Sequence, residues 1–138
     1  MSDNHVFVDT NILVYAHDKD AGRKHVTARQ LIAGLWERSS PPGISIQVLQ
    51  ELYVNLVRKK IPPKTARDIV RDYLQWDVAP GDSALLVDAM SLSERWNISY
   101  WDAGIIAAAR RTGAAILWSE DLSDGQDYGG VKVVNPLP

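Results

Sequence analysis

The sequence predicts an α/β fold, a three-layer α/β/α sandwich with a central, mainly parallel sheet. Short apolar runs bounded by glycine, proline or polar residues, as strands are, alternate with longer segments of helical periodicity. Strands that alternate with helices favour a parallel sheet covered on both faces. No repeat, low-complexity tract or interdomain linker interrupts the 138 residues. We therefore expect a single domain over residues 1–138.

Five apolar runs are the predicted strands, at residues 6–8, 44–46, 78–79, 115–118 and 131–134. The first run ends on Asp9, after which a helix is expected to begin. Further helices are predicted over residues 21–38, 47–60, 64–76, 83–96 and from 99 or 100 to 113. In the helix over residues 21–38, the predicted inward side consists of Val26, Leu31, Leu35 and Trp36. In the helix over residues 47–60, it consists of Val48, Leu49, Leu52, Tyr53 and Leu56.

Residues with strong preferences for helix ends mark several boundaries. Pro62 and Pro63 end one predicted helix and start the next. Asp82 is expected to cap the helix over residues 83–96. Gly113 is expected to close the last helix, since glycine adopts the left-handed conformation common after a helix.

The composition restricts the classes of function. The chain has no cysteine, which excludes disulfides and thiolate metal sites and fits a cytoplasmic location. No apolar run approaches the length of a membrane span, and the start lacks the features of a secretory signal. The net charge of −2 argues against purely electrostatic binding to nucleic acid.

Asp9 and Asp121 each follow a predicted strand, and in open α/β sheets ligands bind at the carboxyl ends of the strands. Asp9, or the adjacent Thr10 or Asn11, is equally suited to cap the next helix. Asp121 is equally suited to form a turn, with the hydroxyl of Ser119 beside it. Three neighbouring acids are expected to be solvated: Glu120, Asp124 and Asp127. Of these, Asp124 is kept as a further candidate for the site.

Glu51 lies early in the helix after the second strand, close to the same edge of the sheet. On a helical wheel it falls with Gln47, Asn55 and Arg58, away from the leucine side. Taken alone, this pattern favours a solvated surface glutamate. Its position after a strand keeps it as a candidate.

Asp102 begins a helix whose next seven residues carry no polar side chain, which indicates a buried helix. Ile105, Ile106 and Ala109 follow on the same face, and a carboxylate buried there needs a partner. The alternative is a local capping box between Ser99 and Asp102.

If the sheet reverses its winding beside the first strand, the acids Asp9, Glu51, Asp102 and Asp121 can face one crevice. Four carboxylates at such short distances repel one another unless a cation binds between them. An all-oxygen cluster suits Mg²⁺ or Mn²⁺. Such ions activate water and stabilise developing charge in phosphodiester cleavage.

Four segments, in order, resemble the acidic motifs of PIN-domain ribonucleases. They are Val8-Asp9-Thr10-Asn11-Ile12-Leu13, Gln50-Glu51-Leu52, Tyr100-Trp101-Asp102-Ala103 and Ser119-Glu120-Asp121-Leu122. The end of the chain, from Gly125 to Pro136, is similar to that of VapC-type toxins. Trp101 is a small departure, because many relatives have another residue there.

The resemblance implies a PIN-like single domain with sheet order 3-2-1-4-5. It implies an endoribonuclease dependent on Mg²⁺ or Mn²⁺, usually a homodimeric toxin held inactive by a small DNA-binding antitoxin. It assigns the acidic quartet to Asp9, Glu51, Asp102 and Asp121, supported by Asn11 and Ser119. Thr10 and Asn11 are then expected to start the helix and support the site.

RNA must approach an acidic centre, so basic side chains are expected around it. The candidates are Arg58, Lys59, Lys60, Lys64, Arg67, Arg110 and Arg111. Each is individually more typical of a solvated helix face. Trp101 is a candidate for stacking on a base, with a place in the core or a dimer interface as the alternative.

Three alternatives remain open at this stage. One is a housekeeping RNA-processing nuclease, and another is a non-catalytic binding module of the same fold. The third is phosphoryl transfer through an aspartyl nucleophile, as in receiver domains and haloacid-dehalogenase-like phosphatases. The phosphatase pattern wants a second aspartate where Asn11 stands, and both classes want a late lysine, for which only Lys132 remains.

Overall fold

Among residues 5–138, which this computed structural model describes, five strands form one parallel sheet in the order β3-β2-β1-β4-β5. The strands are β1 (Val6–Val8), β2 (Gly43–Ser45), β3 (Asp77–Ala79), β4 (Ile116–Trp118) and β5 (Lys132–Val134). The chain runs outward from β1 through β2 to β3 and then returns to the other side of β1 as β4. The sheet therefore reverses its winding beside β1, as the candidate site requires.

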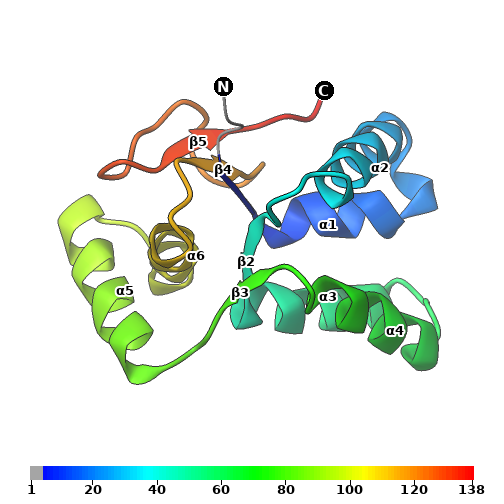
Figure 1. Cartoon of the computed structure of the whole chain (residues 1–138), viewed down its shortest axis with the longest axis horizontal. Coiled ribbons are helices and arrows are strands. Elements are labelled where there is room, and N and C mark those ends of the chain that lie inside the picture. Colours follow the sequence, from blue (N-terminus) through cyan, green and yellow to red (C-terminus); the bar gives the residue numbers. More distant parts are fainter. Residues whose placement is uncertain (1–4) are drawn as a thin grey trace.

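The helices form one layer on each face of the sheet. They are α1 (Thr10–His17), α2 (Arg23–Trp36), α3 (Ile46–Arg58), α4 (Pro63–Tyr73), α5 (Ser83–Trp96) and α6 (Tyr100–Arg111), with a 3₁₀ turn η1 (Lys19–Ala21). Helices α1 to α4 lie on one side of the sheet and α5 and α6 on the other (Figure 1). The predicted α/β/α sandwich is confirmed.

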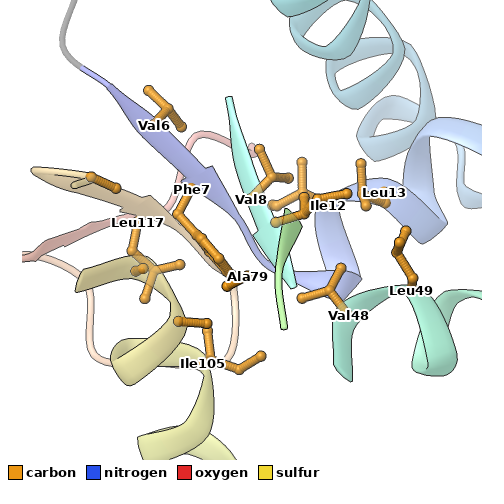
Figure 2. Close-up of a cluster of buried hydrophobic side chains, with 14 of the residues drawn as sticks. Val6, Phe7, Val8, Ile12, Leu13, Val48, Leu49, Ala79, Ile105 and Leu117 are labelled. Atoms are coloured by element: carbon orange, nitrogen blue, oxygen red, sulfur yellow. The ribbon is translucent and has the colours of Figure 1, made fainter. Parts of the chain in front are cut away.

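The core lies on both faces of the central strand. Phe7 and Val8 are fully buried and point to opposite faces, as neighbours in a strand must. Figure 2 shows Phe7 directed toward the side of Ile105, and Val8 toward Ile12 and Leu13. Burial on both faces explains why β1 is apolar throughout.

The predicted helix ends are largely confirmed. The Asp82 carboxylate accepts a hydrogen bond from the Leu85 amide at 3.0 Å, and Pro63 is the first residue of α4. Gly113 follows α6 with a φ of 77°. The second strand ends one residue early, because the Ser45 hydroxyl caps α3 and Ile46 is already helical.

Three predicted inward-facing residues are wrong. On α2, Val26 is 54% exposed and Trp36 is 41% exposed, and on α3 Tyr53 is 38% exposed. The buried residues of α2 are instead Ala28, Ile32 and Leu35. Each helix presents a narrow stripe to its neighbours, and alanine fills part of that stripe where the wheel favoured larger side chains. Within residues 5–138, no helix has the length and apolarity needed to cross a membrane.

Replacing Phe7 by alanine should remove the largest side chain of the central strand. We expect Phe7→Ala to lower the free energy of unfolding by about 3–5 kcal/mol, through lost burial and the cavity left behind. Urea denaturation would measure the change. The exposed Val87→Ala on α5 is the control, with an expected change within about 0.5 kcal/mol. Similar losses in both variants would contradict the assigned core.

Candidate active site at the carboxyl edge of the sheet

The Asp9 carboxylate joins β1 to α1 and uses its two oxygens differently. Oδ1 accepts a hydrogen bond from the Thr10 amide at 2.7 Å, so Asp9 itself is the N-cap of α1. Oδ2 accepts a hydrogen bond from the Ser119 hydroxyl at 2.8 Å. The helix starts at Thr10, as expected, and of the three possible caps Asp9 is the one that is used. Capping and a role in the site are compatible, because one oxygen remains for each.

The environment of Asp9 raises its pKa from 3.8 to about 6. Burial is the main cause, since the residue is only 7% exposed. Hydrogen bonds from Ser119 and Thr10 oppose this rise, while the charges of Asp121 and Glu51 add to it. The charges that act on Asp9 are therefore negative, and the local field favours a bound cation.

The amide of Asn11 connects Asp9 to the turn after β4. Its Nδ2 lies 3.1 Å from Asp121 Oδ2 and 3.5 Å from Asp9 Oδ2. Its Oδ1 accepts a hydrogen bond from the Glu120 amide at 3.1 Å. One neutral side chain thus separates two carboxylates and fixes the turn that carries the second.

Glu51 joins the cluster from α3, so the solvated surface position that its helical pattern alone favoured is not the one it occupies. Its Oε1 accepts a hydrogen bond from the Thr10 hydroxyl at 2.6 Å. Its Oε2 lies 3.4 Å from Gln47 Nε2, one turn earlier in the same helix. The helical wheel of α3 could not show this, because α1 supplies the partner.

Asp102 lies at the edge of the cluster, at the start of α6. Its amide donates to the Ser99 hydroxyl at 3.0 Å, which is the expected half of a capping box. The structure links it to Glu51 through Gln47, whose Nε2 lies 3.3 Å from the carbonyl oxygen of Trp101. Among the described residues, no hydrogen-bond donor is seen on the Asp102 carboxylate. The structure thus brings Asp9, Glu51 and Asp121 into one network and places Asp102 beside it.

A glycine allows this arrangement on α6. A Cβ at Gly104 would lie 2.7 Å from Gln47 Oε1, closer than real contacts allow. The absence of a side chain there lets Gln47 lie across α6 between Glu51 and Trp101.

The donor set fits a hard divalent cation by its chemistry. The groups are carboxylate, hydroxyl and amide oxygens, which Mg²⁺ and Mn²⁺ prefer. Within residues 5–138, however, no three acidic or histidine side chains stand close enough together to surround an ion. Fewer protein ligands are consistent with Mg²⁺, which keeps several of its waters.

Glu120 was expected to be solvated, and this expectation is wrong. Its Oε1 accepts a hydrogen bond from the Tyr15 hydroxyl at 2.7 Å, and its Oε2 pairs with Lys24. The Lys24 ammonium also lies 5.2 Å from the centre of the Tyr15 ring. The hydrogen bond from Lys24 is the main reason why the pKa of Glu120 lies below its usual range. Lys24 and Tyr15 thus fasten the Asp121 turn to α2 and α1, and no local pattern indicated them.

The other acids of this loop serve its backbone. Asp124 Oδ1 accepts a hydrogen bond from the Asn135 amide at 3.0 Å. Asp127 Oδ1 accepts one from the Gly130 amide at 2.7 Å. Neither carboxylate takes part in the network around Asp9.

The predicted RNA-binding cations lie away from the acids. Arg58 and Lys60 are at the end of α3, and Arg58 is about 10 Å along the helix from Glu51. Lys59 pairs with Asp18 at 3.1 Å. Contact with RNA through these residues stays a prediction.

The second predicted group lies at the far end of α6. Arg110 is about 12 Å along the helix from Asp102. Arg111 pairs with Asp82 at 2.7 Å. Trp101, by contrast, is next to the acids and 65% exposed, which excludes a place in the core.

Comparison with known proteins identifies the family. The sequence model of the PIN domain matches residues 6–123. The chain belongs to the PIN domain family. This confirms the family that its four acidic motifs indicate, a family of nucleases. None of the curated proteins matches the sequence significantly.

Several solved structures of toxins share this PIN fold. VapC20 of Mycobacterium tuberculosis, a sarcin-ricin loop cleaving toxin, has a TM-score of 0.68 at 23% identity, over 94% of this chain and 99% of that one. A toxin–antitoxin complex from Klebsiella pneumoniae has a TM-score of 0.70 at 21% identity, over 95% of this chain and 97% of that one. VapBC2 from Rickettsia felis, bound to a promoter DNA fragment, has a TM-score of 0.61 at 18% identity, over 93% of this chain and 96% of that one. At such identities the likeness shows the fold.

The raised pKa of Asp9 predicts a pH-dependent stability. Between about pH 4 and 6, the folded chain keeps a proton that the unfolded chain has lost. The stabilisation from this proton is present below about pH 4 and is lost as the pH rises through about 6. Without divalent ions, Asp9→Asn should therefore be more stable than the wild type at pH 8, by about 2 kcal/mol, and gain less at pH 4.

Urea denaturation at pH 4 and pH 8 in a chelating buffer would measure this difference. The exposed Asp68→Asn on α4 is the matched control, since it removes a carboxylate outside the site. If the free energy of unfolding depended on pH equally in the wild type and in Asp9→Asn, the raised pKa of Asp9 would be contradicted.

Ser119 holds both Asp9 and the turn that follows β4. Its hydroxyl is fully buried, donates to Asp9 and accepts from the amides of Asp121 and Leu122 at 3.2 and 3.3 Å. Ser119→Ala should raise the pKa of Asp9 above about 6 and cost about 1–3 kcal/mol of stability. Carboxyl titration by NMR would measure the pKa, with the exposed Ser123→Ala as control. An unchanged pKa would contradict this role.

Proposed function

We propose that this PIN-domain protein is an endoribonuclease, dependent on Mg²⁺ or Mn²⁺, that hydrolyses RNA phosphodiester bonds. The observation that carries the proposal is the buried Asp9 carboxylate at the switch point of the sheet. Burial, and to a smaller extent the charges of two further acids, raise its pKa, and the hydrogen-bond donors around it are neutral. A carboxylate kept under these conditions is best explained by a cation that offsets the cost.

The residues that would hold the ion are Asp9, Glu51, Asp121 and Asp102, some of them through its waters, because no three of these carboxylates stand close enough together to surround one ion. When bound, such an ion lowers the pKa of water and stabilises the charge that develops on the phosphodiester.

The chain's own residues set the positions of these acids before any ligand arrives. Ser119 fixes Asp9, the Thr10 hydroxyl fixes Glu51, and the Asn11 amide fixes Asp121. All three supports are neutral, so they orient the carboxylates without cancelling the charge that attracts the cation. Orientation prepared in this way lowers the cost of reaching the reactive geometry.

The toxin structures that share the fold support a biological role. We infer that the chain is the toxin of a toxin–antitoxin pair, because its neighbours include a toxin–antitoxin complex and a pair bound to promoter DNA. The inferred partners are a small DNA-binding antitoxin and a second copy of the chain in the cytoplasm. A housekeeping RNA-processing nuclease is the alternative. A small reading frame beside the gene whose product blocks toxicity would favour the toxin, and growth unaffected by expression of the chain alone would favour the alternative.

Asp9→Asn tests the catalytic proposal. The variant should fold, lose RNA cleavage by at least about a hundredfold, and bind Mn²⁺ more weakly than the wild type, because the central carboxylate is removed. Gel analysis of end-labelled RNA and calorimetric titration with Mn²⁺ would measure both. Asp68→Asn is the control and should change neither. Full cleavage by Asp9→Asn would contradict the assignment, and wild-type protein that binds no Mn²⁺ would favour a non-catalytic module.

A further inference from the structure

A pocket of about 380 Å³ opens beside the acidic cluster, between the amino ends of α3, α5 and α6. This volume is at the lower end of the range for pockets that bind small ligands. Its lining includes amide, aliphatic, aromatic and small residues: Gln47, Gln50, Leu86, Tyr100, Trp101 and Gly104. We call it the base pocket.

The base pocket and the acids share a wall. Gln47 lines the pocket, and its Nε2 contacts both Glu51 and the carbonyl oxygen of Trp101. Trp101 is followed directly by Asp102. A ligand in the pocket would therefore lie next to the groups proposed to act on the phosphate.

An exposed aromatic pair forms one side of the base pocket. Trp101 is 65% exposed, although an indole of this size is usually covered. Its ring centre lies 5.1 Å from that of Tyr100, at an interplanar angle of 81°. This edge-to-face contact leaves an indole face for a planar ligand to stack on.

Two carboxamides supply polar groups to the base pocket. Gln50 is exposed, and within residues 5–138 its side chain makes no hydrogen bond. Gln47 is held over Gly104, which has no side chain to displace it. A carboxamide both donates and accepts, and the edge of an unpaired base presents donors and acceptors in the same plane.

The described lining of the base pocket offers no cationic side chain that would bind a phosphate. Among the described residues that line it, Asp82 alone is charged, and it is an acid. Its Oδ1 already accepts from the Leu85 amide and from Arg111. No cation in the lining would neutralise an anion, whereas a neutral, planar and polar ligand meets no such penalty.

From these observations we propose that the base pocket binds one unpaired nucleobase of the RNA, stacked on Trp101 and read by Gln50. This inference rests on the proposed ribonuclease function and specifies its substrate class. The substrate would be RNA with a single-stranded or looped segment at the cleavage site, since a paired base cannot leave its stack without cost.

Photocross-linking tests the location without requiring cleavage. Asp9→Asn protein would be irradiated with single-stranded RNA oligonucleotides that carry 5-iodouracil at one position each. We expect mass spectrometry to find the cross-link in the peptide of Tyr100 and Trp101, and much less of it with the same sequence in a duplex. Cross-links confined to other peptides, or equal yields from duplex RNA, would overturn the proposal.

Binding measurements test the role of each wall. Trp101→Ala should weaken binding of a looped RNA by about tenfold, and Trp101→Phe should retain most of the affinity. Gln50→Ala should change the preference among the four bases at the stacked position. Gln30→Ala, an exposed glutamine on α2, is the matched control and should change neither. Fluorescence anisotropy would measure affinity, and thermal denaturation would show that the variants fold.

The outcomes separate the two proposals. If the wild-type protein cleaves no RNA but RNA cross-links at Trp101, the nuclease proposal is overturned and the base-pocket proposal stands. If the wild-type protein cleaves RNA, but Trp101→Ala leaves the affinity unchanged and Gln50→Ala leaves the base preference unchanged, the base-pocket proposal is overturned and the nuclease proposal stands.

Discussion

The Asp9 carboxylate is buried where β1 becomes α1, and the surrounding structure depends on how it is held. One oxygen caps α1 and the other receives the Ser119 hydroxyl, so the carboxylate connects two neighbouring strands through their carboxyl ends. Burial would favour the neutral acid, and its pKa rises to about 6. The site is therefore under electrostatic strain that a bound cation would relieve.

The supports of the acidic cluster are neutral where they touch the acids proposed to bind the ion. Thr10, Asn11 and Ser119 orient three carboxylates, and the cation of Lys24 is directed to Glu120 instead. This division has a physical reason, because a lysine on Asp9 or Asp121 would satisfy the charge and compete with a metal ion. Lys24 and Tyr15 instead anchor the turn that carries Asp121.

The helix layer on the other face completes the site. Helix α6 brings Asp102 to the edge of the cluster, and Gly104 leaves room for Gln47 to reach across from α3. The same residue, Gln47, lines the base pocket. Gln47 thus connects the acids to the pocket, and the elements that meet there are distant in sequence.

The sequence by itself determined the alternation of strands and helices, the helix ends at Pro63, Asp82 and Gly113, and the position of Asp9 after a strand. These features depend on apolar periodicity and end preferences, which act over a few residues. Only the tertiary structure decided that Glu51 faces Thr10 and that Glu120 is clamped by Lys24, since the partners are 41 and 96 residues apart. A helical wheel cannot show which neighbouring element covers a polar face, and packing settles that.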